Sequence, residues 1–110
     1  DIASLSLKMS ARAKYKRKFA DKITNFDPLT DLLKIDVDSF GIDDSATFAT
    51  GVNKKAVKKI SMQDFDFLYD QKKGGLYFNE NGADKGFGEG GIIAILKGAP
   101  DLTSNNLEFL

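Results

Sequence analysis

The sequence contains neither histidine nor cysteine among its 110 residues. Without these side chains the chain has no Ser-His-Asp triad, no Cys-His pair and no ordinary zinc site. It also has no disulfide framework. Catalysis would have to rely on carboxylates, lysine or tyrosine, and no carboxylate pair stands in a recognisable catalytic motif. We therefore expect a non-catalytic protein.

Long apolar runs and an excess of charge of one sign are also missing. The 16 basic residues balance 16 acidic residues, so the net charge is zero, and we expect no whole-protein attraction to nucleic acid or membrane. No apolar run approaches the ~20 residues of a membrane-spanning helix, and no N-terminal signal peptide pattern is present. The length fits a single domain over residues 1–110. Because the chain begins with Asp1, we expect a fragment or a processed product.

The stretch from Asp70 to Lys97 is the most informative part of the sequence. Two β-branched and aromatic segments, Phe65–Tyr69 and Leu76–Phe78, flank a lysine-glycine turn. A polar, glycine-rich loop follows, and then the apolar run Ile92–Leu96. This order predicts an antiparallel meander of three strands. We expect one core with contributions from Phe67, Tyr69, Leu76, Phe78, Ile93 and Ile95.

The rest of the chain predicts shorter strands and one short helix. Strands are expected at Leu5–Met9, Lys22–Phe26, Lys34–Asp38 and Leu107–Leu110. The alternation in Lys34–Asp38 places Ile35 and Val37 on one face. The spacing of apolar residues in Lys54–Ile60 predicts an amphipathic helix, which Asn53 can cap. The fold class we expect is mainly β, a small antiparallel sandwich or roll with one or two short helices.

Residues 1–20 predict a lead-in strand followed by a basic loop. The run Ser10–Lys18 is strongly basic. One interpretation is a solvated loop; the other is a patch that binds phosphate groups or anionic lipid. The candidate residues for the patch are Arg12, Lys14, Lys16, Arg17 and Lys18. An alternative function is therefore a free-standing interaction module that binds an anionic partner through residues 8–18.

Two polar groups are candidate calcium ligands, because carboxylate and amide oxygens suit this hard cation. The first group is Asp21, Asp27, Asp31 and Asp36, which would converge if two short strands lie side by side. The second group is Asn79, Asn81, Asp84 and Glu89. The second group departs from the EF-hand loop pattern, since Tyr77 stands at the first ligand position. The alternative interpretation is solvated acids at strand ends in the first case and a polar turn in the second.

Four stretches, taken in this order, resemble the C-terminal flanking domain of haemolysin-type calcium-binding (RTX) proteins, which are secreted by bacteria. They are Asp21–Pro28, Lys34–Phe40, Phe67–Gly82 and Ile95–Leu102. The order and spacing of the stretches carry the resemblance, which covers about residues 21–110. It implies a β-rich domain that follows a calcium-filled β-roll in the same polypeptide.

The resemblance also implies a function. It implies a non-catalytic module that caps the open edge of the upstream β-roll and carries a type I secretion signal. The signal would lie in the acidic and apolar ending, which consists of Leu107, Glu108, Phe109 and Leu110. The implied partners are the upstream β-roll and the type I secretion machinery, with no nucleic acid, and the implied location is extracellular.

The sequence departs from this family where calcium would bind. No glycine-glycine-x-glycine-x-aspartate repeat occurs, and Asn25, Asn79 and Asn81 stand where the family pattern has aspartate. Each replacement removes an anionic oxygen, and calcium affinity depends on the charge of the ligands. We expect the isolated chain to bind calcium weakly or not at all, or calcium to be supplied by upstream repeats.

Overall fold

The computed structural model of the chain describes residues 6–11, 15–80, 87 and 90–110. Its β-strands are β1 (Ser6–Met9), β2 (Asp21–Ile23), β3 (Leu32–Ile35), β4 (Phe48–Gly51), β5 (Phe67–Asp70), β6 (Gly75–Phe78), β7 (Gly91–Leu96) and β8 (Leu107–Phe109). Its helices are α1 (Val37–Phe40) and α2 (Lys54–Ile60), with short 3-10 turns η1 (Arg17–Phe19), η2 (Ser61–Gln63) and η3 (Ser104–Asn106).

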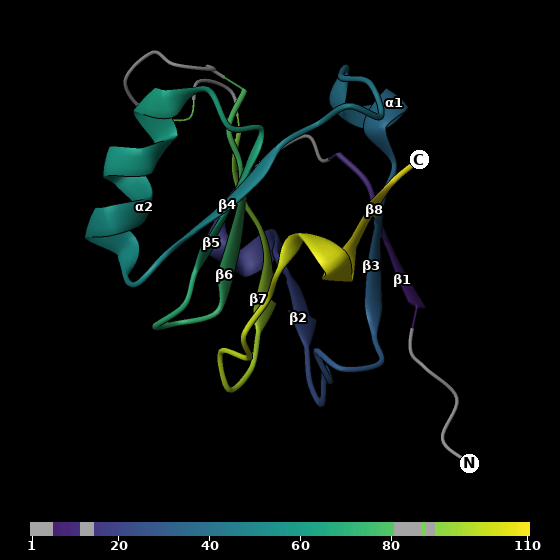
Figure 1. The fold of residues 1–110 in the computed structure, drawn as a ribbon, viewed down its shortest axis with the longest axis vertical. Coiled ribbons are helices and arrows are strands. Elements are labelled where there is room, and N and C mark those ends of the chain that lie inside the picture. The colour runs from purple at the N-terminus through teal and green to yellow at the C-terminus, as the bar shows by residue number, and fades with distance from the viewer. Residues whose placement is uncertain (1–5, 12–14, 81–86, 88–89) are drawn as a thin grey trace.

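The strands form two sheets, which we call sheet A and sheet B. Sheet A has the order β1-β3-β8, and both of its pairs are parallel. Sheet B has the order β2-β7-β6-β5-β4 (Figure 1). The predicted mainly β fold with two short helices is confirmed. The predicted antiparallel meander is β5-β6-β7. The expected antiparallel orientation is wrong for the other pairs, because the chain crosses to the other sheet, or passes through α2 between β4 and β5, before it returns.

The crossings wind the chain into a coil. The chain runs from β1 in sheet A to β2 in sheet B, and then returns to sheet A as β3, parallel to β1. After an excursion through α1, β4, α2, β5 and β6, it continues as β7 beside β2 and as β8 beside β3, again in parallel. Parallel neighbours need such crossover connections. Stacked turns with parallel neighbours are a feature that this winding shares with β-solenoids.

Aromatic side chains fill the core between the two sheets. Phe67 on β5 lies at the centre: its ring centroid is 5.5 Å from that of Phe78 on β6 and 5.6 Å from that of Phe109 on β8. Phe40 of α1 meets the same ring edge-on at 5.3 Å. Such offset and edge-to-face pairs are favourable beyond the area that they bury. The cluster joins both sheets and α1.

The outer face of sheet B is covered by α2. Asn53 caps this helix, since its side-chain oxygen accepts a hydrogen bond of 2.9 Å from the backbone N–H of Ala56. Val57 is fully buried against Leu68 and Tyr77, which alternate with the inward-facing residues of their strands. The predicted helix and its N-cap are confirmed.

Two local predictions need correction. Ile95 was expected in the core between the sheets, but it packs on the outer face of sheet B. A register shift opposite Leu76/Tyr77 places Ile93 and Ala94 both inward, as an extra residue at a β-bulge does, so the alternation changes phase. The strand predicted over Lys34–Asp38 ends at Ile35, and Val37 begins α1. This turn allows Phe40 to reach the core.

The turn between β5 and β6 packs closely on β7, so we expect it to tolerate substitution of Gly74 poorly. Gly74 has a φ of +77°, and a Cβ there would lie 2.1 Å from the carbonyl oxygen of Leu96. Gly98 has a similar φ of +85°, with open space around it. We expect G98A to cost about 1–2 kcal/mol of unfolding free energy, from backbone strain alone. G74A should cost a further ~1–3 kcal/mol, because backbone atoms must shift. Urea unfolding measures both; equal costs would contradict the packing of this turn on β7.

Candidate functional site

The candidate site is the outer edge of the first coil, formed by β1 and β2. Each is an edge strand, and within the described residues no strand pairs with its outer side. The carbonyl of Met9 accepts a hydrogen bond from the N–H of Asp36, and that of Ile23 accepts one from the N–H of Lys97. Peptide groups of parallel strands alternate between neighbours. The backbone groups of Lys8 and Lys22 therefore point outward, away from the fold.

The outer edges of β1 and β2 lie at the same end of the molecule. Phe109 on β8 stacks on Phe67 on β5, so the β8 edge of sheet A faces the β5 side of sheet B. The opposite edge of sheet A, β1, then faces the β2 side of sheet B. β1 and β2 each pair in parallel with their inner neighbour. Strands of a further coil can therefore pair with their outer edges in the same direction.

The opposite end of the coil differs in sheet B. Beyond β7, sheet B continues with the antiparallel hairpin β6-β5, which interrupts the parallel order, and its last strand, β4, pairs with β5 in parallel, while β8 is the corresponding edge of sheet A. The connection that leads to β8 is fixed from both sides. The hydroxyl of Tyr69 donates to the carbonyl of Pro100 at 2.7 Å, and the amide of Asn106 donates to the carbonyls of Pro28 and Asp31 at 2.8 and 3.1 Å. Burial raises the pKa of Tyr69, which keeps its hydroxyl a donor.

The structure brings only two of the four candidate aspartates together. A carboxylate oxygen of Asp31 accepts a hydrogen bond of 2.7 Å from the backbone N–H of Asp27, and Asp27 accepts one from the N–H of Leu29. Both carboxylates thus organise the turn after β2. Asp21 begins β2, and Asp36 precedes α1. In the part of the chain that the structure describes, no group of three or more acidic, histidine or cysteine side chains is placed to hold a metal ion.

The second calcium group is only partly described. Asn81, Asp84 and Glu89 lie outside the described residues. Asn79 follows β6 and is buried, with 2% of its surface exposed. Its side-chain amide donates to the carbonyl of Ser61 at 2.8 Å, which ties the end of β6 to η2. Asn79 is therefore a structural residue of the interior here. The weak calcium binding that we expect of the isolated chain stays a prediction.

The basic side chains of the run Ser10–Lys18 are exposed where they are described. Arg12 and Lys14 lie outside the described residues, whereas Lys16, Arg17 and Lys18 are exposed at η1. The ammonium of Lys18 lies 5.1 Å from the centre of the Phe19 ring. Burial, followed by the charge of Asp70, raises the pKa of Tyr77, and the nearby charge of Arg17 opposes this rise. Arg17 thus lies close to the outer face of sheet B, where Tyr77 packs.

The four residues of the expected secretion signal form the last strand and the end of the chain. Leu107 is buried and Phe109 packs on the core, whereas Glu108 is exposed. Leu110 is exposed, but its backbone bonds to Ile35 and Val37 on the neighbouring chain segment. The alternating strand that the sequence predicts is confirmed.

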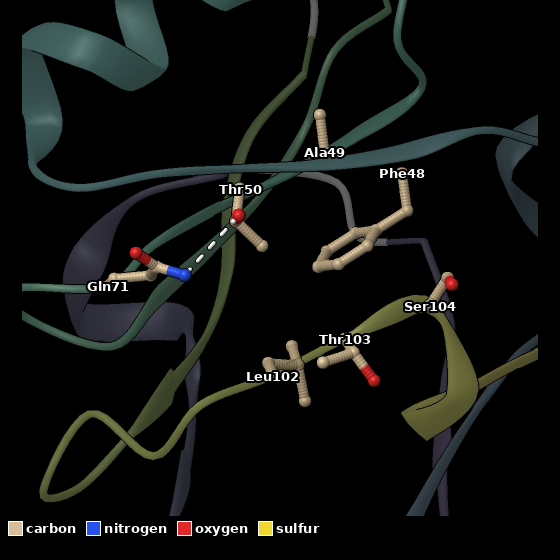
Figure 2. Close-up of a pocket in the computed structure, with 7 residues that line it drawn as sticks. All are labelled: Phe48, Ala49, Thr50, Gln71, Leu102, Thr103 and Ser104. Carbon is tan, nitrogen blue, oxygen red and sulfur yellow. Dashed lines mark hydrogen bonds between the residues drawn. The ribbon is translucent and has the colours of Figure 1, made fainter.

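A groove of about 300 Å³ lies between β4 and the segment that precedes β8 (Figure 2). Phe48 and Leu102 form its apolar part, and Thr50, Thr103 and Ser104 supply hydroxyl groups. The side-chain amide of Gln71 donates to the hydroxyl of Thr50 at 3.3 Å. All lining side chains are neutral, so the groove offers no acid-base pair.

Sequence analysis missed the open edges as a site, because they consist of backbone groups. Their only sequence indication is the position of two short strands before the meander. The lysines of α2 were recognised as a helix pattern, but not as part of a surface.

Comparison of the chain with protein-family models, with curated proteins and with solved structures finds no match. No helix in the described ranges has the length and apolar character needed to cross a bilayer.

Replacing Asn79 with aspartate should have opposite effects on stability if Asn79 is a structural residue and if it is a calcium ligand. N79D replaces the amide donor to Ser61 with a buried carboxylate. We expect a loss of roughly 3 kcal/mol in unfolding free energy, because the hydrogen bond to the Ser61 carbonyl is lost and a charge is placed in the interior. N105D, at an exposed position, serves as the control with little effect. Urea unfolding with and without calcium checks this. A calcium-dependent recovery of N79D stability would show that Asn79 belongs to a metal site.

Proposed function

We propose that this chain is the non-catalytic C-terminal cap of a parallel β-solenoid, in the manner of the RTX flanking domains that it resembles. The upstream coil belongs to the same polypeptide and pairs with the outer edges of β1 and β2. The observation that carries the proposal is the winding of the chain itself. It makes parallel coils whose first turn is open on one side.

The asymmetry of the two ends supports a cap rather than a repeat in the middle of an array. A middle coil would continue in parallel order on both sides of sheet B, whereas here two antiparallel pairs, β7-β6 and β6-β5, stand beyond β7. Open sheet edges invite aggregation, and natural proteins cover them. Terminal repeats of solenoids differ from the others for this reason.

We infer that secretion is the second role, carried by residues 107–110. In the folded domain, Phe109 is packed against Phe67. An export machinery would have to recognise this segment before the chain folds. Folding outside the cell then converts the exposed segment into β8, which adds to sheet A beside β3. The same four residues thus serve export first and stability afterwards.

A proline in the open edge tests the cap. Pro is tolerated where a strand edge faces solvent, since no ladder hydrogen bond is lost. K22P should therefore leave the isolated domain within about 1 kcal/mol of wild type, and yet block pairing with an upstream strand. The test fuses a calcium-binding β-roll before residue 1 and measures the thermal midpoint of the roll.

We expect the wild-type domain to raise the midpoint of the roll, K22P to remove this gain, and K22A to retain it. K22A is the matched control, because it removes the same ammonium but keeps the backbone N–H. A roll whose midpoint is the same with and without the wild-type domain would contradict capping.

Substitutions in β8 separate the two roles of the C-terminus. Glu108 is exposed, so E108Q should change stability by less than about 0.5 kcal/mol. F109A removes a ring from the core and should cost roughly 2–4 kcal/mol. Deletion of Leu107–Leu110 should lower both stability and export of an upstream reporter through a type I system, whereas E108Q should lower export alone. If the deletion leaves export unchanged, the secretion role is wrong, and the capping role is unaffected.

A further inference from the structure

The outer face of α2 carries a concentrated positive charge. Lys54, Lys55, Lys58 and Lys59 are all exposed. With 3.6 residues per turn, these four positions fall on one side of the helix, and Ala56, Val57 and Ile60 fall on the other. The second side packs on sheet B, with Val57 fully buried. Figure 1 shows α2 on the outside of the molecule, beside sheet B, so the exposed lysine side of the helix faces away from the sheet.

This charge is unfavourable for the helix itself. Like charges four residues apart destabilise a helix, and both such pairs, Lys54 with Lys58 and Lys55 with Lys59, are present. Lys54 and Lys55 also stand in the first turn, where the helix dipole favours acids, and no acid stands there. Among the described residues, no ion pair compensates them. A local arrangement that opposes stability is expected where a surface has a function.

Exposed apolar side chains lie beside the lysines. Val52, before the helix, is 69% exposed, and Met62, after it, is 48% exposed. Met62 follows Lys58 by four residues, so it extends the same face. Large apolar side chains with this exposure cost free energy in water, which they would regain at an apolar boundary.

The turn η1 adds to the same side of the molecule. Ala20, which ends η1, packs in the outer cluster with Val57. Arg17 and Lys18 are exposed there, and Phe19 is 44% exposed. Two elements that lie far apart in the sequence thus contribute cations and apolar side chains to one face of sheet B. We call this surface the basic face and define it as Arg17, Lys18, Phe19, Val52, Lys54, Lys55, Lys58, Lys59 and Met62.

We propose that the basic face binds the surface of a bilayer that contains anionic phospholipid. The ammonium groups pair with lipid phosphates, and Val52, Met62 and Phe19 enter the boundary between headgroups and acyl chains. Clusters of four to eight lysines or arginines on an amphipathic element are typical of such contacts. The apolar side chains favour a lipid surface over a polysaccharide or nucleic acid, because a polyanion offers them no apolar layer.

Vesicle flotation tests this with the whole chain. We expect binding to vesicles of phosphatidylcholine with 30% phosphatidylglycerol, and none to phosphatidylcholine alone. Each neutralised lysine should weaken binding about fivefold, so K55Q/K59Q should lose roughly 25-fold in the partition coefficient. Both substitutions of this variant relieve repulsion between residues 55 and 59 of the helix, so the unfolding free energy should not fall. Binding should also decrease steeply with salt.

The control K34Q/K97Q changes the net charge equally. Lys34 is half-buried on β3 in sheet A, between the inward-facing Leu33 and Ile35, and Lys97 is exposed after the end of β7. This control should bind as the wild type does. Equal loss in the two double variants would overturn the basic face and leave only a net-charge effect.

A second measurement reports on the apolar side chains. The chain has no tryptophan, so M62W provides a single fluorescent reporter on the basic face. Its emission should shift to shorter wavelength when anionic vesicles are added, and should not shift with heparin. No shift with vesicles, or binding to heparin without binding to vesicles, would overturn the proposal.

Discussion

The contact between Phe67 and the three rings around it is the constraint on which the rest of the structure depends. Phe67 brings β6, β8 and α1 to one point, although these elements are far apart in the sequence. Since β8 must reach Phe67, sheet A is held over sheet B in one arrangement. That arrangement places β1 and β2 at the end of the molecule away from Phe67. The open edges that we propose to pair with an upstream coil are thus a consequence of aromatic packing at the opposite end.

The meander and the helix could be predicted because their information is local. The aromatic alternation around Phe67 and Leu76 determines which residues face inward, and Asn53 marks where α2 begins. The parallel pairing of β1 with β3 could not be predicted in this way. The pairing of β1 with β3 requires β2 to lie in the other sheet, and no short sequence pattern indicates this. Likewise, no glycine or proline among residues 92–96 indicates the β-bulge that places Ile95 on the outer face of sheet B.

The same distinction between local and long-range information applies to the candidate site residues. Asp27 and Asp31, two members of the predicted calcium group, stabilise a turn through backbone N–H groups. Composition does not distinguish this use from metal binding. Asn79 occurs beside a glycine-rich polar loop, which predicts exposure. It is buried because η2 presents a carbonyl group, that of Ser61, which needs a donor. A buried polar residue of this kind is recognised only when its distant partner is known.

Net charge conceals how the charges are arranged. The sum of zero predicts no attraction to an anionic surface, and yet residues 27–44 contain six aspartates and one lysine, whereas residues 54–59 contain four lysines and no acid. The fold sends the first segment to the turn before β3 and to α1, and the second to the outer face of sheet B (Figure 1). Screening limits each charge to about 8–10 Å at physiological salt. At that range the local lysine face, and not the zero sum, determines what a surface in contact with α2 experiences.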